Sequence, residues 1–492
     1  MEQAIEIGQP RWSRWSPAGV VAAILVATLF TRLGAFGDPS YSADDAVFLL
    51  IGDGLRHGLI PYVDLWDRKP IGTFLLFAAI RQAGGDGIVA AQVAAGVAAF
   101  MTALLLFRTA RLSASILGST LAAVAYLLWL SIFGGGGAQI TVFYNLLMLA
   151  AGAMVLLEIR RKGPPRRLSM ALSMAFAGLA MLCKQTVAVE GALFAISFLV
   201  LAWKRGASLR CLLTDAVMMA VVAVAPTATA LAYFQMTGHL QDYWFATVTS
   251  NSLRKPDLPG RIATRLVLFN AELLPLAILA VWGYRRRLAV DPQGTYFLLV
   301  WAVVAYAAML LTPRFYVYYF TPLLVPLSLL AAQALNRIAA ILLILWPSLL
   351  IAVWNGGILQ FGYTRSSIAA FDAIRDEVVA RSAPNDRLLL LDGPPQLYLS
   401  TGRSPSTPYV YPLHLMADIE GSALPIPQTE AIRRAFAVRP SVIIAPTVIY
   451  NTRVSHEVIE TLRHELRDYR FIGARPVMQE GRPVKVGIWI RR

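Results

Sequence analysis

The segment ADDAVFLLIGDGLRHGLIPYVDLWDRKPIGTFLLF, residues 43–77, carries the strongest structural and chemical signals of the chain. Its first part predicts a helix that ends at Gly58 and whose apolar face enters the membrane interface. Its last part predicts a second helix that begins near Pro70, because proline is favoured at the first helical position. The apolar run after Pro70 is too short to cross a membrane, which takes about 20 residues. We therefore expect two juxtamembrane helices in this loop.

The composition around this segment is that of an integral membrane protein. Of the 492 residues, 57% are apolar and only 15% are charged, and the mean hydropathy is +0.58. Soluble proteins have about 25% charged residues. The net charge of +15 would suggest nucleic-acid binding in a soluble protein, but the positions of the basic residues give it another meaning.

Eleven apolar segments predict membrane-spanning helices. The first lacks a clear small-residue cleavage site, so we expect it to be retained as an anchor rather than removed as a signal peptide. Only the short sequence KQT, residues 184–186, divides the fifth segment from the sixth. The segments are 18–36, 87–107, 112–132, 140–158, 168–183, 186–203, 212–234, 262–283, 295–311, 318–335 and 338–354.

Basic residues in the short loops orient these spans, because Lys and Arg favour the cytoplasmic side. If eleven spans alternate from a cytoplasmic N-terminus, every basic cluster lies on that side and the C-terminus lies outside. The net charge is then largely a signal of topology, and no nucleic-acid partner is expected. The clusters are Arg11, Arg14, Arg108, Arg111, residues 160–167, Lys204, Arg205, Arg210, residues 285–287 and Arg337.

Three segments outside the membrane are long, namely residues 37–86, 235–261 and 355–492. The last one predicts a small α/β domain, since apolar strand-like runs alternate with amphipathic helical patterns. We therefore divide the chain into a membrane module, 1–354, and an extracytoplasmic domain, 355–492. The expected strands are 387–393, 441–447 and 484–491, and the expected helices are 366–382 and 454–466.

Asp44 and Asp45 open the first juxtamembrane helix and have two interpretations. Ser42 followed by Asp45 resembles a capping box, and acids in the first turn also suit the helix dipole. Alternatively, one carboxylate is a general base that takes a proton from an acceptor hydroxyl. Adjacent helical residues point about 100° apart, so we do not expect both acids to have the same role.

Cations on the same side of the membrane are candidates for binding a phosphate. Lys69 precedes Pro70 and either reaches lipid headgroups or holds a phosphate, with Asp67 as an ion-pair partner. Lys184 interrupts an apolar sequence, and ionisable residues within a membrane are functional candidates. Arg314 opens the tenth span among tyrosines that include Tyr318; the alternative for Lys184 and Arg314 is anchoring of a helix end. Acids inside spans that pair with such cations or line a cavity are Glu190 and Glu272.

The segment 43–77 resembles the first-loop signature of the GT-C superfamily. More narrowly, it is similar to bacterial relatives of protein O-mannosyltransferases and of the lipid A aminoarabinose transferase. The matching positions are Asp44-Asp45, the turn from Gly58 to Tyr62, and Lys69-Pro70. The segments CKQTVAVEGALF (183–194) and PRFYVYYFTPLLVPLSLLAA (313–332) resemble later parts of the same family.

This resemblance implies a polytopic α-helical membrane enzyme of the GT-C type in the bacterial inner membrane. Such enzymes transfer a sugar from a polyprenyl-phosphate donor, such as undecaprenyl phosphate, to a glycan, glycolipid or protein acceptor of the cell envelope. The resemblance assigns the general base to Asp44, with Asp45 beside it. It assigns the lipid phosphate to Lys69, Lys184 and Arg314. Beyond the resemblance, we consider Tyr62 and Tyr318 as candidates for donor binding, and Asp67, Glu190 and Glu272 as candidate supporting residues.

The chain departs from the family pattern at two positions, and both concern the acceptor site. Relatives carry an acid near the start of the fourth span, where this chain has Thr141. Relatives also carry a histidine in the later Arg/Tyr segment, where this chain has Tyr318.

The expected mechanism is one direct displacement at the anomeric carbon, which would invert its configuration. Asp44 deprotonates the acceptor hydroxyl, and the cations stabilise the departing phosphate. No cofactor or metal is required, because a phosphate leaves without a second carboxylic acid, although Asp44 and Asp45 could hold a divalent ion. The alternatives are a transporter or flippase of lipid-linked saccharide, an oligosaccharide ligase of the same superfamily, and a non-enzymatic assembly protein.

Overall fold

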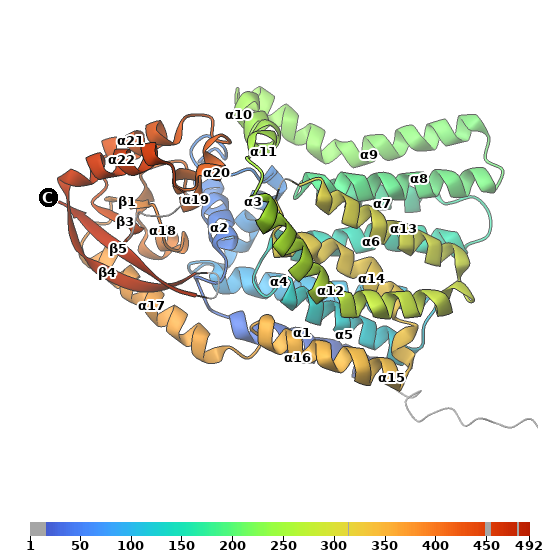
Figure 1. The fold of residues 1–492 in the computed structure, drawn as a ribbon. Coiled ribbons are helices and arrows are strands. Elements are labelled where there is room, and N and C mark those ends of the chain that lie inside the picture. The colour runs from blue at the N-terminus through green and yellow to red at the C-terminus, as the bar shows by residue number, and fades with distance from the viewer. Residues whose placement is uncertain (1–15, 313, 448–453, 480–481) are drawn as a thin grey trace, which may run out of the picture.

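The computed structural model describes residues 16–312, 314–447, 454–479 and 482–492. It shows a bundle of long helices, and a C-terminal α/β layer covers one end of this bundle (Figure 1). Arg11 and Arg14, which contribute to the predicted topology, lie outside the described residues. The polytopic helical fold with a small C-terminal sheet is therefore confirmed.

Eight helical segments among the described residues are long and apolar enough to span a membrane. All coincide with predicted spans. Three further predicted spans are shorter apolar helices, namely α5 (Ile116–Ile132), α7 (Arg167–Met181) and η6 with α14 (Val317–Ala331). The count of eleven stays a prediction. The eight long segments contain α1 (Pro17–Arg32), α4 (Ile88–Ala110), α6 (Ile140–Arg160), α8 (Ala188–Lys204), α9 (Leu209–Met236), α12 (Pro259–Leu288), α13 (Pro292–Leu310), and α15 (Ile338–Ala340) continuing to α16 (Trp346–Asn355).

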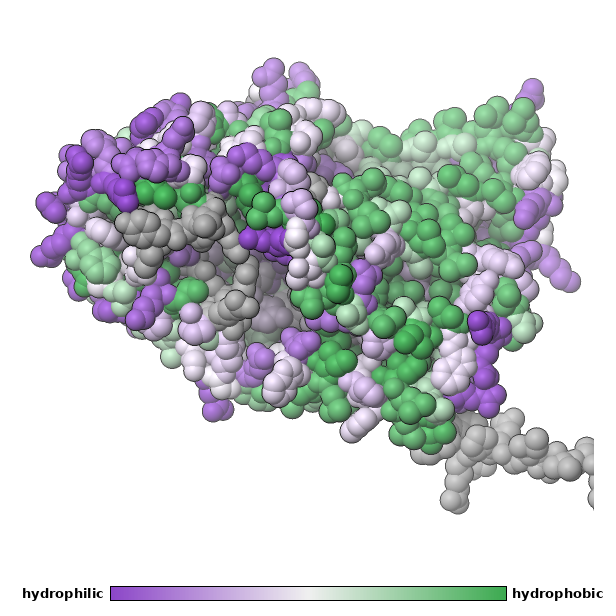
Figure 2. All heavy atoms as spheres, in the orientation of Figure 1, coloured by the Kyte–Doolittle hydropathy of each residue, from purple (hydrophilic) through white to green (hydrophobic). Residues whose placement is uncertain are grey.

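Local signals in the sequence explain where several of these helices begin. The Ser16 side chain accepts a hydrogen bond from the Gly19 amide, and Ser208 does the same for Cys211. Asp291 caps α13 and is followed by Pro292. Such residues satisfy amide groups that have no partner inside the helix. On the face shown in Figure 2, the bundle is largely hydrophobic and the C-terminal layer is largely hydrophilic. These surfaces suit a lipid and an aqueous environment respectively.

The two helices of the first loop form the junction between the bundle and the C-terminal layer. They are α2 (Ala43–Arg56) and α3 (Ile71–Ile80). Phe48 of α2 packs against Phe74 and Phe77 of α3, with ring centroids 6.2 and 5.4 Å apart. Most of the apolar side chains of α2 are buried by other parts of the protein. This differs from the expected interfacial helix: the apolar face of α2 packs on protein, because the C-terminal layer and α3 cover it.

The C-terminal layer contains a five-stranded sheet with the order β2-β1-β3-β5-β4. Strands β1 and β3 are parallel, whereas β5 pairs antiparallel with β3 and β4. Four strands are β1 (Arg387–Leu390), β2 (Ser404–Pro405), β3 (Val442–Pro446) and β5 (Arg482–Arg491). The fifth is β4 (Tyr469–Gln479). Two strands were not expected: β2 has only two residues, and the β4 residues YRFIGARPVMQ do not alternate cleanly, with a register shift in the pairing with β5.

Helices of the C-terminal layer flank this sheet and reach towards the first loop (Figure 1). The predicted helices 366–382 and 454–466 correspond to α17 (Phe361–Ala380) and α22 (His456–Glu465). The Trp66 amide donates to the Pro408 carbonyl at 2.9 Å, which ties the first loop to the layer. The remaining helices are α18 (Gln396–Thr401), α19 (Pro412–Met416), α20 (Asp418–Gly421) and α21 (Gln428–Ala437).

Candidate active site

The two acids at the start of α2 point to different neighbours. The Asp45 carboxylate is buried and accepts a hydrogen bond from the Ala138 amide at 2.6 Å. Its own amide donates to the Ser42 side chain at 3.3 Å, which is the expected cap. The half-buried Asp44 instead accepts from the Gln139 side chain at 3.2 Å. Asp45 therefore has a structural partner, while Asp44 is the more accessible carboxylate.

A run of glycines, Gly134–Gly137, makes the close approach to Asp45 feasible. A Cβ atom on Gly137 would lie 2.6 Å from the Asp45 carboxylate oxygen. Arg32 at the end of α1 donates to the carbonyls of Gly135 and Gly137. Burial raises the pKa of Asp45 to about 7, against the lowering effect of the Ala138 amide. This glycine segment was missed in the sequence analysis, although four consecutive glycines after an apolar helix are a visible signal.

Lys69 is held by residues of its own loop. Its amide donates to the Asp67 carboxylate at 2.9 Å, and the Tyr62 hydroxyl donates to its carbonyl at 3.0 Å. Its ammonium group lies 5.7 Å from the centroid of the Phe48 ring, on α2. Burial raises the pKa of Asp67, whereas Lys69 lowers it and Asp44 raises it. Asp44, Asp67 and Lys69 are thus close enough to influence one another.

Lys184 reaches the same region because α3 packs on the turn before it. The Gly72 amide donates to the Leu182 carbonyl at 2.9 Å, and the Thr73 hydroxyl donates to the Cys183 carbonyl at 3.2 Å. The Lys184 ammonium group lies 4.0 Å from the centroid of the Tyr319 ring. It also interacts electrostatically with Lys69, Glu190 and Asp44. The fold therefore brings one carboxylate and two lysines together from three segments of the sequence.

The two acids inside spans have different surroundings. Glu190 lines a small cavity together with Lys184 and Tyr319, and it accepts a hydrogen bond from the Trp301 indole at 2.5 Å. Glu272 lies on α12, where its side chain accepts a 3.5 Å hydrogen bond from Asn355. Within the described residues, this hydrogen bond does not connect Glu272 to Lys69 or Lys184.

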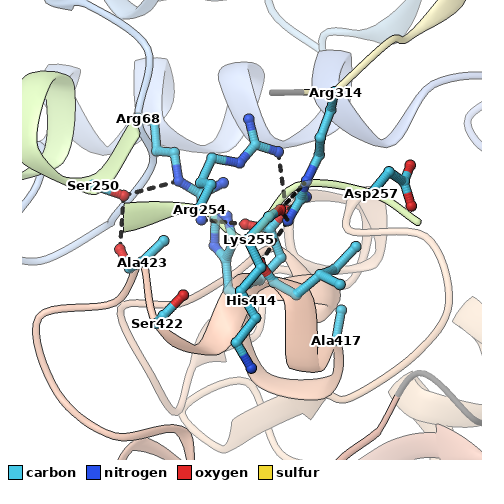
Figure 3. A network of polar contacts seen from close by, with 12 residues as sticks. Arg68, Ser250, Arg254, Lys255, Asp257, Arg314, His414, Ala417, Ser422 and Ala423 are labelled. Atoms are coloured by element: carbon cyan, nitrogen blue, oxygen red, sulfur yellow. Dashed lines mark hydrogen bonds and ion pairs between the residues drawn. The ribbon is translucent and has the colours of Figure 1, made fainter. Parts of the chain in front are cut away.

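Arg314 points to the C-terminal layer. It is fully buried, forms an ion pair with Glu420 of α20, and donates to the Ile419 carbonyl at 2.5 Å (Figure 3). Tyr318 stacks on Tyr316, with ring centroids 5.5 Å apart. The partners of Arg314 on the layer could not be expected from its position in the sequence, because Glu420 is more than 100 residues away.

In the described part of the chain, no group of three or more His, Cys, Asp or Glu residues is arranged to hold a metal ion. Asp44 and Asp45 accept hydrogen bonds from different partners, the Gln139 side chain and the Ala138 amide.

The arrangement of the bundle, first loop and C-terminal layer is also found in solved structures of other proteins. ArnT from Cupriavidus metallidurans in the apo state superposes with a TM-score of 0.64 and 12% identity, over 96% of this chain and 98% of that one. The same enzyme bound to undecaprenyl phosphate gives 0.62 and 13%, with the same coverage. The archaeal oligosaccharyltransferase AglB from Archaeoglobus fulgidus, in complex with an inhibitory peptide and a dolichol-phosphate, gives 0.50 and 12%, over 95% of this chain and 74% of that one.

The chain thus shares its architecture with GT-C enzymes. Comparison with protein-family models and with curated proteins finds no match. At these low identities the likeness establishes the fold, and the reaction has to be argued from the site.

Proposed function

We propose that this protein is a glycosyltransferase that transfers a sugar from a polyprenyl-phosphate donor to an acceptor hydroxyl at the outer face of the inner membrane. The observation that carries the proposal is the grouping of Asp44 with Lys69 and Lys184 where the bundle meets the C-terminal layer. The GT-C fold and the undecaprenyl phosphate bound to ArnT support the same donor class.

In the proposed mechanism, Asp44 takes the proton of the acceptor hydroxyl as its oxygen attacks the anomeric carbon. The bond from that carbon to the lipid phosphate breaks, and Lys69 and Lys184 stabilise the negative charge that develops on the phosphate. A single displacement inverts the anomeric configuration. Asp67 and Tyr62 hold the backbone of Lys69, so we assign them a positioning role.

The test measures sugar transfer by purified protein in nanodiscs, with undecaprenyl-phosphate monosaccharides as donors and envelope fractions as acceptors. Asp44→Asn should lower transfer by about 10²–10⁴-fold while donor binding persists. Lys69→Ala should weaken donor binding. Asp53→Asn is the matched control, because Asp53 lies on the same helix but pairs with Arg81 and Arg56. Full transfer by both Asp44→Asn and Lys69→Ala would refute the mechanism.

An oligosaccharide ligase is the second candidate, because the fold is also that of AglB. The same assay with a diphosphate-linked oligosaccharide donor separates the two: turnover of that donor alone would favour the ligase. The fold favours either transferase over a transporter or flippase.

A further inference from the structure

Three arginines from distant segments, which Figure 3 labels, form ion pairs with one carboxylate at the junction of the bundle and the C-terminal layer. Glu420 of α20 forms ion pairs with Arg68 of the first loop, with Arg314 before η6, and with Arg254 at 3.0 Å. The four side chains are between 1% and 12% exposed. We call these residues the arginine cluster and its carboxylate.

The other hydrogen-bond partners of the arginine cluster are uncharged. Arg68 donates to the Ser250 hydroxyl at 2.9 Å, and Arg314 donates to the carbonyls of Lys255 and Ile419. Nε of Arg254 has no partner among the described residues. Nδ1 of the buried His414, close by, also has none there.

Nearby acids do not complete the charge balance. Asp67 accepts a hydrogen bond from the Lys69 amide and interacts electrostatically with both Lys69 and Arg68. Asp418 pairs with Lys255 at 3.1 Å on the surface. Asp257 pairs with Arg261 and Arg265. Among the described residues, three guanidinium groups therefore form ion pairs with one carboxylate. Even with Asp67 counted against Arg68, an excess of at least one positive charge remains.

Such an excess of buried charge is costly unless an anion compensates it. Guanidinium groups have the planar donor geometry that fits phosphate and carboxylate oxygens. Burial opposes the ionisation of Glu420, but Arg68, Arg254, His414 and Arg314 outweigh it and lower its pKa to about 2. Glu420 is therefore an anion at every physiological pH and competes with any other anion at this place.

We propose that Arg68, Arg254 and Arg314 form a second anion subsite, which takes a phosphate group of a substrate and which Glu420 fills in this structure. Because Arg68 is adjacent to Lys69, the subsite adjoins the donor site, and in this respect the inference rests on the proposed function. The C-terminal layer contributes the competing carboxylate, so entry of a phosphate displaces α20 from the arginines. The phosphate belongs either to the lipid donor or to a phosphorylated acceptor.

The test compares Glu420→Gln with wild type in nanodiscs, using two probes, undecaprenyl phosphate and inorganic phosphate. Glutamine keeps the size of the side chain but removes the competing charge, so phosphate binding should tighten at least about tenfold. Asp418→Asn is the matched control, since it removes one negative charge from the same helix at an exposed ion pair. It should leave binding unchanged.

The pattern across the probes identifies the source of the phosphate. Tighter binding of undecaprenyl phosphate alone indicates the lipid headgroup, whereas tighter binding of inorganic phosphate, alone or with the lipid, indicates a subsite that accepts a phosphate without the lipid chain. Unchanged or weaker binding of both probes overturns the proposal. If Glu420 has only a structural role, neutralising it loosens the arginine cluster and does not tighten phosphate binding.

A second variant keeps the test decisive if Glu420→Gln does not yield folded protein. Arg254→Gln should then weaken binding of at least one probe by about tenfold or more, and unchanged binding of both would overturn the subsite. Failure of the proposed function is distinguished from failure of the subsite by a different result. In that case Lys69→Ala would retain donor binding and transfer, whatever the result for Glu420→Gln.

Discussion

At the scale of single residues, the Asp44–Asp45 pair shows how one helix gives two identical side chains different environments. Asp45 turns inwards to the Ala138 amide, while Asp44 faces Gln139 and the lysines. The separation follows from the rotation of about 100° between neighbouring helical residues. Both interpretations of the acids therefore have a place: the capping interpretation fits Asp45, and the proposed base is Asp44.

The buried Asp45 predicts a pH dependence of stability. Its pKa in the folded protein is about 7, above the ordinary value of 3.8, because burial disfavours the charged form. Its contribution to stability is therefore complete below the ordinary value and is lost as the pH rises through about 7. The thermal unfolding temperature of the wild type should fall between about pH 4 and pH 7, and this fall should be smaller in Asp45→Asn. An equal fall in both proteins would contradict the assignment.

At the scale of elements, the contact between α3 and the turn before Lys184 sets the distance between the two lysines. Gly72 lies against the Leu182 backbone, and an added Cβ atom would be 2.6 Å from the Leu182 carbonyl oxygen. Because that neighbour is backbone, it cannot move aside as a flexible side chain would. The close approach of these two elements thus depends on the absence of a side chain at residue 72.

Gly72→Ala should therefore destabilise the protein by about 1–3 kcal/mol and weaken binding of the donor phosphate by separating the lysines. Thermal unfolding and binding of undecaprenyl phosphate measure the two effects. Gly362→Ala in α17 is the control, because no atom lies within 4 Å of its added Cβ. That variant should be neutral or more stable by up to about 1 kcal/mol. Equal behaviour of the two variants would show that the contact is not required.

At the scale of the whole molecule, Trp66 connects the first loop to the C-terminal layer. Its side chain is 2% exposed, and its ring lies 4.8 Å from His414 and 5.7 Å from Tyr409, measured between centroids. Trp66→Ala should cost about 3–5 kcal/mol and make the layer more sensitive to limited proteolysis. Trp354→Ala is the control, since Trp354 is 82% exposed. If both variants unfold at the same temperature as wild type, the layer does not depend on this contact.

The sequence by itself determined the helical membrane fold, the positions of its apolar helices and the presence of a small α/β part, because apolar run length and alternation are local properties. It also indicated Asp44, Lys69 and Lys184 as candidates, because ionisable groups are scarce among apolar residues. The tertiary structure alone decided that α2 is buried, that Asp45 contacts the glycine segment, and that Glu420 meets three arginines. These contacts join residues that are far apart in the chain. A local sequence pattern does not indicate which distant side chain will compensate a buried charge.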